Sequence, residues 1–370
     1  MTAVPTFVLP GGVDDPATPS GGNVFDRRVH RELARRGRPV REAAIPGAWP
    51  EPDAAARARL EQVLDAVPDG GTVLLDGLVA CGVPDVIVPR SPRLRLAVLV
   101  HLPLADETGL SAERAAALDG AERDTLRAAS AVIATSPRAV RGLVERHGLD
   151  ARRIFTVEPG TDGAPLAPGT DGGRRLLCVA SVTPRKGHDI LVPALAEVGD
   201  LRWECLCVGP AAPESAYARR VRGQVARSGL EARIHFAGPL GGAALGDAYA
   251  GSDVLVLPSR AETFGMVVTE ALARGTPVIA SAVGALPDTL GQPAGGAVPG
   301  LLVPPNDVRA LAGALRSWLV DGDLRARLRS AARRRRDRLR PWADTARDMA
   351  AVLDRIPGPT DLRARCEDAR

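Results

Sequence analysis

The sequence predicts an α/β protein with two Rossmann-like, doubly wound domains, each built on a parallel sheet. Short apolar segments alternate with helical stretches along nearly the whole chain, which is typical of parallel strands joined by crossover helices. The chain has 370 residues, enough for two domains that each bury a core. A Gly- and Pro-rich stretch without periodicity, residues 163–175, marks the expected boundary between them.

The first domain is expected to span residues 1–162. Its first strand is Thr6–Leu9, and after a loop rich in Gly, Asp and Pro the apolar spacing predicts a helix over Asn23–Arg36. The further strands predicted here are Thr72–Asp76, Arg95–Leu99, Ala131–Thr135 and Arg153–Val157.

The second domain, residues 163–340, repeats the alternation. Its predicted strands are Leu176–Ala180, Trp203–Val208, Arg233–Phe236, Val254–Leu257 and Pro277–Ala280. Pro341 interrupts a basic helical stretch, and a new helix is expected over Thr345–Arg355. Residues 341–370 are therefore predicted to form a terminal helix and a tail.

Composition predicts a globular, cytoplasmic protein. Hydrophobic residues make up 45% of the chain and charged residues 25%. The first residues, MTAVPTFVLPGG, lack the basic start and long apolar run of a secretory signal. No window approaches the roughly 20 apolar residues of a membrane span, and the five cysteines have neither metal-site spacing nor a disulfide framework.

The net charge of +4 comes with two arginine clusters, Arg27–Arg41 and Arg325–Arg340. Aromatic residues are only 3% of the chain and do not interleave with these clusters, which argues against nucleic-acid binding. Solvated helix faces are the favoured interpretation. Peripheral contact of these helices with an anionic membrane surface or a phosphorylated acceptor stays open.

The most informative segment runs from Leu257 to Gly284. An apolar strand breaks into a turn at Pro258, and apolar spacing then predicts a helix packed on a sheet. Glu262 lies at the mouth of this helix and Glu270 inside it. At 1.5 Å rise per residue the two carboxylates would lie about 12 Å apart, about the reach of a sugar nucleotide from ribose to hexose.

These two glutamates have complementary expected uses. Glu262 could accept hydrogen bonds from sugar hydroxyls, while Glu270 could hold a ribose. The unpaired N–H groups at Phe264 and Gly265 would face an anion or a hydroxyl at the start of the helix.

This segment resembles the EX7E signature of retaining glycosyltransferases with the GT-B fold, the large family 4 group (glycosyl transferases group 1). There the motif reads approximately E-x-F-G, a second Glu, then A-x-A-x-G-x-P-V and a Gly-rich turn. The residues that match in register are Glu262, Phe264, Gly265, Glu270, Ala271, Ala273, Gly275, Pro277, Val278 and Gly284.

The resemblance covers nearly the whole chain. It implies two Rossmann-like domains facing a central cleft, with the acceptor on the N-terminal side, a nucleotide-sugar donor on the C-terminal side, and a terminal helix that crosses back to the N-terminal domain. Thr263, Phe264, Gly265 and Glu270 belong to the implied donor-binding group, together with Gly21 and Gly22 of the first loop.

The first loop, GGVDDPATPSGGNVF, carries a second candidate group. Gly21 and Gly22 immediately before a helix would let the backbone approach a diphosphate, and family members place a Gly-Gly pair here. Asp14 and Asp15 are expected to be turn residues, although loops at this position often meet the acceptor.

The segment SVTPRKGHD presents Arg185 and Lys186 at the start of a helix near His188. Such cations can neutralise a diphosphate leaving group, as a metal does elsewhere. The family pattern is approximately G-R-x-x-x-x-K-G. Lys186 and Gly187 match it, but Ser181 stands at the place of the family arginine, and we expect Arg185 to supply the guanidinium instead.

His101 follows the predicted strand Arg95–Leu99. A lone histidine after a strand is most often structural, but the resemblance implies a position beside the reacting sugar. Asp106 and Glu107 lie on the loop after this strand. Loops at the carboxyl ends of strands face the ligand crevice in an open α/β sheet, so both are expected to help bind the acceptor.

Together these features predict transfer of a sugar from a nucleoside diphosphate sugar, a UDP-sugar before a GDP-sugar, to a hydroxyl of a small soluble acceptor. The resemblance implies retention at the anomeric carbon by front-face attack, the departing phosphate taking the acceptor's proton. His101, Glu262, Arg185 and Lys186 form the expected catalytic group. No Asp-x-Asp metal motif stands out in the segments named above, so neither a metal nor a cofactor is expected.

Three alternatives remain open at this point: a lipid- or polysaccharide-directed glycosyltransferase at a membrane surface, a nonhydrolysing sugar-nucleotide epimerase, and a noncatalytic GT-B binding protein. A Rossmann oxidoreductase is disfavoured, because Gly11-Gly12 and Gly21-Gly22 do not give the G-x-G-x-x-G spacing.

Overall fold

The structure is a computed structural model that describes residues 4–170, 172–212, 215–291 and 298–356. The tail predicted at the end of the chain lies outside these residues. Contacts divide the chain into two compact units, one of Met1–Asp14, Ser20–Gly160 and Trp342–Arg370, the other of Asp15–Pro19 and Thr161–Pro341. Each unit is described by itself.

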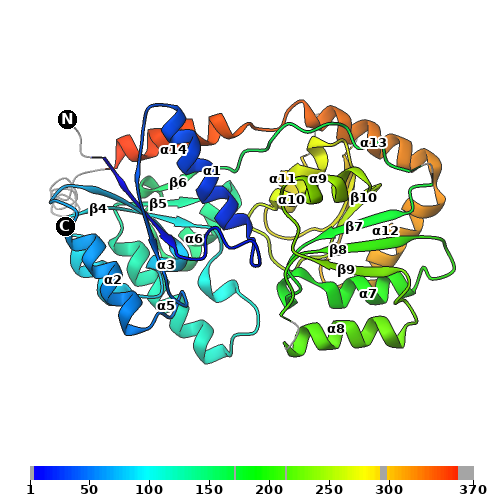
Figure 1. Cartoon of the computed structure of the whole chain (residues 1–370), viewed down its shortest axis with the longest axis horizontal. Helices are drawn as coiled ribbons and strands as arrows, with labels where there is room; N and C mark the ends of the chain where they lie inside the picture. Colours follow the sequence, from blue (N-terminus) through cyan, green and yellow to red (C-terminus); the bar gives the residue numbers. More distant parts are fainter. Residues whose placement is uncertain (1–3, 171, 213–214, 292–297, 357–370) are drawn as a thin grey trace. The chain divides into compact units, whose positions relative to one another are not determined.

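The first unit is built on a six-stranded parallel sheet in the order β2-β1-β3-β4-β5-β6 (Figure 1). Its strands are β1 (Thr6–Pro10), β2 (Arg41–Ile45), β3 (Thr72–Asp76), β4 (Arg95–Val100), β5 (Ala131–Ala134) and β6 (Ile154–Thr156). Its helices are α1 (Gly21–Arg35), α2 (Ala54–Asp65), α3 (Gly77–Ala80), α4 (Pro84–Ile87), α5 (Ala112–Ala128), α6 (Pro137–His147) and α14 (Trp342–Arg355), with 3₁₀ turns η1 (Val88–Arg90), η2 (Leu104–Asp106) and η3 (Ala151–Arg153).

The second unit contains another six-stranded parallel sheet, in the order β12-β11-β10-β7-β8-β9. Its strands are β7 (Arg175–Val179), β8 (Glu204–Val208), β9 (Ile234–Gly238), β10 (Val254–Leu257), β11 (Val278–Ser281) and β12 (Gly300–Val303). Its helices are α7 (His188–Ala196), α8 (Ala216–Arg227), α9 (Gly242–Ala250), α10 (Met266–Ala273), α11 (Leu286–Leu290), α12 (Val308–Val320) and α13 (Gly322–Arg336), with the 3₁₀ turn η4 (Pro184–Lys186).

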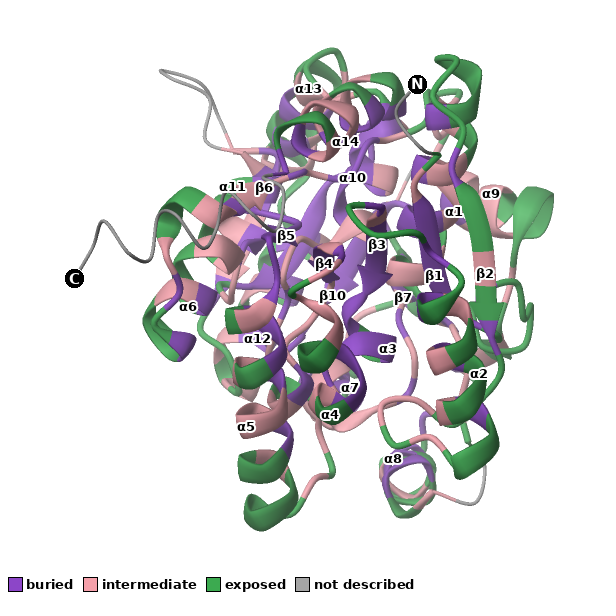
Figure 2. Ribbon diagram, turned by 90° about the vertical axis from the view of Figure 1, so that its left-hand side faces the viewer, coloured by how far each residue is buried: buried purple, intermediate pink, exposed green. Residues whose placement is uncertain are grey.

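The two sheets confirm the predicted fold class, and central strands behave as expected for parallel sheets covered on both faces. Every residue of β10 and β11 is buried, as is almost all of β4. Figure 2 shows the central strands β1, β3 and β4 buried, while β2 is largely exposed. β2 and β12 were not predicted. Each is an edge strand, and β2 reads REAAI, which lacks the apolar run of a buried strand.

The helix α14 belongs to the first unit although it comes from the end of the chain. It packs on α1, where the Phe25 and Trp342 rings meet edge to face with centroids 5.9 Å apart. The Thr345 hydroxyl donates to the Glu158 carbonyl at 2.8 Å. The sequence-based boundary lies at residues 162 and 163, and the contacts divide the chain at Gly160 and Thr161.

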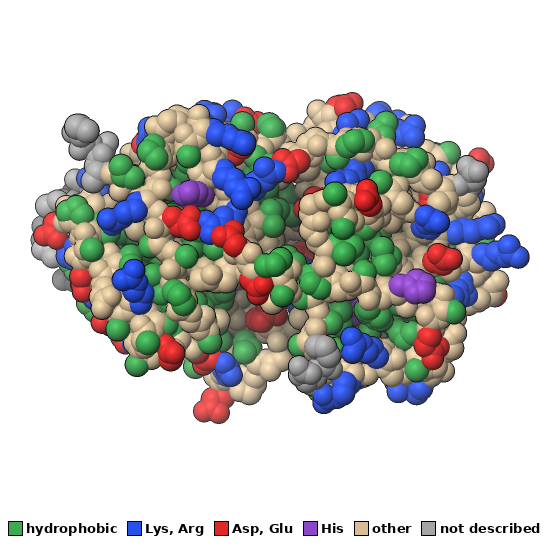
Figure 3. All heavy atoms as spheres, in the orientation of Figure 1, with side chains coloured by type: hydrophobic (Ala, Val, Ile, Leu, Met, Phe, Trp, Pro, Cys, Tyr) green, Lys and Arg blue, Asp and Glu red, His purple; other side chains and the backbone are tan. Residues whose placement is uncertain are grey.

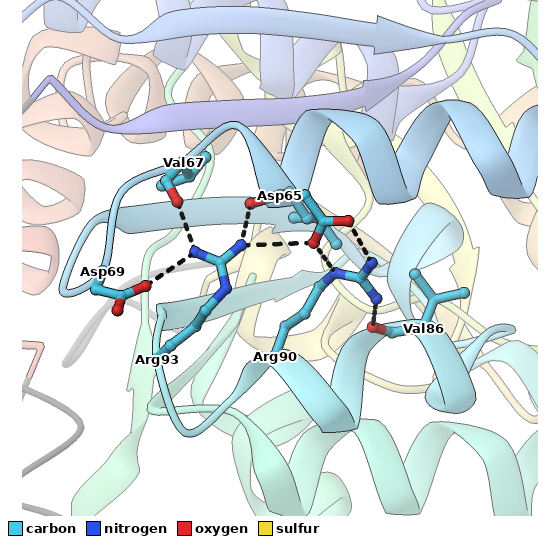
Figure 4. Close-up of polar contacts among 7 residues, drawn as sticks. Asp65, Val67, Asp69, Val86, Arg90 and Arg93 are labelled. Atoms are coloured by element: carbon cyan, nitrogen blue, oxygen red, sulfur yellow. Dashed lines mark hydrogen bonds and ion pairs between the residues drawn. The ribbon is translucent and has the colours of Figure 1, made fainter.

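Arginines brace the amino ends of β3 and β4 (Figure 4). Arg90 makes two hydrogen bonds to the Asp65 carboxylate, at 2.8 and 3.0 Å, and this contact lowers the pKa of Asp65. Arg93 donates to the carbonyls of Leu64 and Val67, at 2.6 Å each. These contacts tie the end of α2 to the turns before both strands.

Candidate functional site

His101 and Asp76 lie at one edge of the first sheet. Asp76 is the last residue of β3 and His101 follows β4 directly; these two strands are parallel neighbours, so their carboxyl ends meet. Asp26 reaches the same place from α1. Its Oδ1 lies 2.9 Å from Nε2 of His101, and Oδ2 of Asp76 lies 3.9 Å from that nitrogen.

Burial and charge set the protonation of this trio. The side chains of Asp26 and Asp76 are 0% and 4% exposed and that of His101 is 18% exposed. Burial lowers the pKa of His101, with the Asp76 charge opposing it. Burial raises the pKa of Asp26 to about 7 and raises that of Asp76 well above its ordinary range.

The start of α1 packs closely against the His101 ring. A Cβ added at Gly22 would lie 3.0 Å from Cδ2 of His101, so the ring occupies the space that any other residue at position 22 would need. Phe25 meets the same ring edge to face, with centroids 5.3 Å apart. Three residues of α1, Gly22, Phe25 and Asp26, therefore contact His101.

The prediction that Gly21 and Gly22 precede a helix is wrong in detail. Both lie in the first turn of α1, and Ser20 is the N-cap, its hydroxyl accepting from the Asn23 N–H at 3.1 Å. Ser20 was a better N-terminal signal than the glycines, because a serine oxygen can satisfy an orphan helix N–H. The close approach of Gly22 to His101 is by itself a structural reason for a glycine at this position.

The candidate acceptor residues all have contacts within the protein. Asp14 pairs with Arg27, and Asp15 accepts from the Ala17 N–H and the Thr18 hydroxyl, both at 2.9 Å. The Ala17 hydrogen bond lowers the pKa of Asp15. These contacts agree with the expected turn roles of both residues.

Asp106 and Glu107 lie at the end of η2. Arg146 of α6 donates to the Asp106 carboxylate at 2.6 Å, and Glu107 accepts from the Thr108 N–H at 3.0 Å. Their expected contact with an acceptor stays a prediction.

In the second unit, Lys186 and Glu262 come from the loops that follow two neighbouring strands, β7 and β10. The Lys186 ammonium lies 2.6 Å from Oε1 of Glu262, and the Ser259 hydroxyl donates to the same oxygen at 2.8 Å. The side chains of Lys186 and Glu262 are only 16% and 7% exposed. The two expected catalytic residues thus form a largely buried ion pair.

Lys186 is the only lysine in the sequence, and the other 47 of the 48 basic residues are arginines. A lysine ammonium is a compact point charge, whereas a guanidinium is a planar fork that suits carbonyls and carboxylates. All the remaining basic residues are arginines, so the compact ammonium occurs only beside Glu262.

The prediction that Glu262 lies at the mouth of the helix is wrong. α10 begins at Met266, and Glu262 lies in the preceding loop, where its carbonyl accepts from the Ala285 N–H at 3.0 Å. The 12 Å separation inferred from helical rise therefore does not apply. Glu270 does lie within α10, as predicted.

Glu270 is paired with a tyrosine. The Tyr249 hydroxyl donates to Oε2 of Glu270 at 2.7 Å, and the Arg274 guanidinium carbon lies 4.7 Å from the centre of the Tyr249 ring. Burial raises the pKa of Glu270, while the Tyr249 hydrogen bond lowers it. The carboxylate thus has a fixed orientation and keeps acceptor capacity for a further hydroxyl.

Arg260 and Asp189 brace the loops that carry Lys186 and Glu262. Arg260 donates to both carboxylate oxygens of Asp189, at 2.9 and 3.1 Å, and its backbone N–H donates to the Arg185 carbonyl at 2.7 Å. The Tyr217 hydroxyl also donates to Asp189, at 2.7 Å. Burial raises and Arg260 lowers the pKa of Asp189, which ends below its ordinary value.

Sequence reasoning missed these supporting residues. One signal was available: the chain has only two tyrosines, and Tyr217 and Tyr249 each donate to a carboxylate around this site. The supporting role of Arg260 could not be deduced, because its partner Asp189 lies 71 positions away.

The remaining predicted donor residues lie around the start of α10. Gly265 has φ +87° and precedes the helix, while the Phe264 carbonyl accepts from the Thr289 hydroxyl at 2.6 Å. Thr263 is half-buried beside them. Gly187 has φ +71°, and a Cβ there would lie 2.1 Å from the Pro258 carbonyl oxygen, so only glycine fits directly after Lys186.

Many arginines of the second cluster serve structural roles. Arg325 donates to the Trp318 carbonyl at 2.7 Å, Arg329 pairs with Asp253 at 2.8 Å, and Arg336 donates to the Ala164 carbonyl at 2.7 Å. Blue and red side chains are interspersed on the face that Figure 3 shows. None of the helices described here is long and apolar enough to cross a membrane.

A cavity of about 630 Å³ opens at the amino ends of β7 and β8, where Arg174, Arg202 and Trp203 help to line it. Lys186 and Glu262 follow the carboxyl ends of strands in that sheet, so this cavity belongs to the opposite edge. Ligands of open α/β sheets bind at the carboxyl edge. The cavity is therefore not the candidate site.

Asp26, Asp76 and His101 also form, within the described residues, a group whose potential ligand atoms all lie within 4.8 Å of one another. The 2.9 Å contact already uses Nε2 of His101 and Oδ1 of Asp26 in a hydrogen bond. We therefore interpret the trio as a hydrogen-bonded network.

Comparison with known proteins supports the predicted class. Residues 168–335 match the model of a family described as glycosyl transferases group 1. The chain is 33% identical over 257 residues to the D-inositol 3-phosphate glycosyltransferase of Kineococcus radiotolerans, covering 63% of this chain and 59% of that protein. The corresponding protein of Rhodococcus erythropolis is 32% identical over 293 residues, covering 73% and 64%. The chain thus spans less than two thirds of the length of these relatives.

Solved structures share the fold over almost the whole chain. Sucrose-phosphate synthase from Thermosynechococcus elongatus has a TM-score of 0.77 at 24% identity, covering 95% of this chain and 98% of that one. Anabaena Alr3699/HepE in complex with UDP and glucose has a TM-score of 0.73 at 19% identity, covering 95% and 99%. WaaG, a glycosyltransferase involved in lipopolysaccharide biosynthesis, has a TM-score of 0.72 at 19% identity, covering 96% and 100%.

These likenesses confirm the GT-B fold. The family match and the named relatives, which are glycosyltransferases, support the prediction of a transferase enzyme.

Proposed function

We propose that this protein is a retaining, family 4 glycosyltransferase that moves a sugar from a nucleoside diphosphate donor to a hydroxyl of a small soluble acceptor. The observation that carries the proposal is the ion pair of Lys186 and Glu262. It joins two segments singled out separately by sequence, and it lies at the carboxyl edge of a sheet within the region that matches the family.

Lys186 would neutralise the diphosphate as the glycosidic bond breaks. Its ammonium is already held in place by Glu262, at 2.6 Å, in a largely buried position where a charge acts more strongly than in water. A donor diphosphate would share or take over this ammonium, which would leave Glu262 able to accept from a hydroxyl of the donor sugar. Arg185, on the same turn, would provide the second cation.

Glu270 would hold the ribose. Its carboxylate is oriented by Tyr249 and retains capacity to accept from ribose hydroxyls. The helix N-terminus formed by Phe264, Gly265 and Met266 lies a little over one turn before it on the same helix.

No protein nucleophile is needed in this mechanism. The acceptor hydroxyl attacks from the face that the diphosphate leaves, and the departing phosphate oxygen takes the hydroxyl proton. His101 would contact the sugar near the reacting carbon. Lys186 and Arg185 supply the positive charge, so the reaction requires neither a metal nor another cofactor, and a cytoplasmic enzyme would meet its nucleotide-sugar donors directly.

The relatives guide the choice of substrates. Two curated relatives are named D-inositol 3-phosphate glycosyltransferases, so a polyol phosphate is the first acceptor to test. One solved neighbour holds UDP and glucose, so UDP-sugars are the first donors, ahead of GDP-sugars. A membrane-surface acceptor is the second candidate, because WaaG takes part in lipopolysaccharide biosynthesis.

A donor screen followed by turnover tests the proposal. UDP-, GDP- and ADP-sugars are compared by thermal shift, and the stabilising donor is then incubated with polyols and polyol phosphates while UDP, GDP or ADP release is measured. Product stereochemistry by NMR decides between retention and inversion. Conversion of the donor to its epimer without any acceptor would favour the epimerase, and donor binding without turnover would favour a binding protein.

The single lysine permits a second test. A UDP derivative in which pyridoxal replaces the sugar presents an aldehyde that forms an imine with a nearby amine, and borohydride fixes the product. Labelling should map to Lys186 and be prevented by the donor. Labelling of the chain's α-amino group alone would contradict the site.

A further inference from the structure

The Asp26 and Asp76 carboxyl groups are buried next to each other at the edge of the first sheet. Asp26 comes from α1 and Asp76 from the end of β3, and their side chains are 0% and 4% exposed. Two ionised carboxylates buried within 4.8 Å of each other repel strongly, so one proton between them is the stable arrangement.

The hydrogen bonds around the pair leave one place for that proton. Oδ1 of Asp26 accepts from His101 at 2.9 Å, and Oδ1 of Asp76 accepts from the Leu78 N–H at 2.6 Å. Oδ2 of Asp26 is buried and receives no N–H or O–H from the described residues. One oxygen of each carboxyl group and a ring nitrogen of His101 all lie within 4.8 Å of one another. A hydrogen bond between two carboxyls requires a proton on one of them.

We propose that Asp26 and Asp76 share one proton at neutral pH, and that this singly charged pair holds His101 as the neutral tautomer with its proton on Nε2. Asp26 and Asp76 are thus positioning residues for His101. The contribution of His101 to sugar transfer rests on the function proposed above; the shared proton does not.

The charged groups around Asp26 and Asp76 are consistent with one shared proton. Besides Asp76 and His101, the ionisable groups that act on the pair are Arg27, the residue after Asp26 on α1, and the buried Cys81 beyond α3. Arg27 is already paired with Asp14 and Glu42. Burial is the main cause of the raised pKa values of both carboxyls.

Asparagine substitutions test the shared proton without any substrate. In Asp26→Asn, Oδ1 still accepts from His101 and the amide takes the place of Oδ2, donating to Asp76. In Asp76→Asn, Oδ1 still accepts from Leu78 and the amide donates to Asp26. Each single variant therefore reproduces one protonated form of the pair.

The double variant D26N/D76N cannot make this bond, because two amide N–H groups would face each other. At pH 7 the melting temperature of each single variant should lie within about 3 °C of that of the wild type. The melting temperature of the double variant should fall by about 5–10 °C more than the two single losses added together. Additive effects would overturn the proposal. Asp69→Asn, at a carboxylate that is 84% exposed, is the matched control.

Nitrogen-15 NMR of histidine-labelled protein reads the tautomer directly. The signal of His101, identified by its loss in His101→Gln, should be that of a neutral ring protonated on Nε2 at pH 7 in the wild type and in Asp26→Asn. An imidazolium, or a proton on Nδ1, would overturn the proposal. The melting temperature should also be the same with Zn²⁺ and with EDTA, since stabilisation by Zn²⁺ would assign the site to a cation.

Turnover then tests positioning. Asp26→Asn keeps the acceptor for His101 and should retain kcat within about threefold, whereas Asp26→Ala removes it and should lower kcat at least about tenfold. Equal losses in both variants would contradict the positioning role. If no donor is turned over at all, the function proposed above fails while the melting and NMR results still decide the shared proton.

Discussion

Replacing Lys186 with methionine should separate the structural and chemical uses of the ion pair. Methionine keeps the length of the side chain but leaves Glu262 as an unpaired, largely buried carboxylate. Breaking a buried ion pair on one side costs about 3–5 kcal/mol. The 16% exposure of the Lys186 side chain favours the lower end, about 3 kcal/mol, which corresponds to a loss of about 6–12 °C in melting temperature for a domain of this size.

The double variant Lys186→Met with Glu262→Gln removes the unpaired buried charge of Glu262. It should regain most of the lost melting temperature, because neither buried group is then ionised. Activity should not return: loss of the cation that stabilises the leaving diphosphate is expected to lower kcat about 10²–10³-fold in both variants. Arg327→Ala, at an exposed arginine of α13, is the control for loss of one positive charge.

Thermal melts and release of the nucleoside diphosphate provide the two measurements. Turnover of Lys186→Met within tenfold of the wild type would refute the assignment of Lys186 to the leaving group. A double variant as unstable as the single one would refute the ion-pair argument. Lys186→Arg adds a further comparison, because a planar guanidinium should not fill the position of the compact ammonium.

Three further predictions follow from single contacts. Gly22→Ala should displace the His101 ring by a few tenths of an ångström and lower turnover about tenfold or more, while Gly12→Ala, which has open space, should not. Arg260→Ala should destabilise the protein by about 2–3 kcal/mol in thermal melts and weaken donor binding, because the Asp189 brace is lost. The raised pKa of Asp26, about 7, means that the folded state holds its proton more tightly than the unfolded chain. The Asp26 proton should therefore make stability fall as pH rises from about 4 to 7, by at most about 4 kcal/mol. Denaturant titrations of Asp26→Asn should show a correspondingly smaller slope.

The fold could be predicted because the central strands carry their own signal. Strands such as β4 and β10 are continuous apolar runs, as expected when both faces of a parallel sheet are covered. The edge strand β2, which reads REAAI, has a neighbour on one side only and lacks such a run. The edge strand β12 reads GLLV, so its apolar residues were present but were not recognised as a strand. Pairing with β1 stabilises β2, and that partner lies about 35 positions away in the sequence.

Only part of the candidate site could be predicted. Lys186, Glu262 and Glu270 belong to local motifs, so their identities can be read in the sequence. Their partners could not, because the topology brings them together: Lys186 and Glu262 are 76 positions apart, and they meet only because β7 and β10 are neighbours in the sheet. The start of α1 was mispredicted for a different reason: a Gly-Gly pair is typical of a turn, whereas here it lies in the first helical turn and Ser20 caps the helix.

Arginine and lysine have different roles in this protein: arginines support the fold, and the single lysine lies in the candidate site. Arg90, Arg325 and Arg336 donate to backbone carbonyls, which suits a planar guanidinium with several fixed donors. In the proposed mechanism the cation must pass from a carboxylate to a moving phosphate, which is the opposite requirement, since a fixed fork would have to break several bonds at once. A compact ammonium can rotate among acceptors, which is a physical reason for the single lysine of this chain to lie beside Glu262.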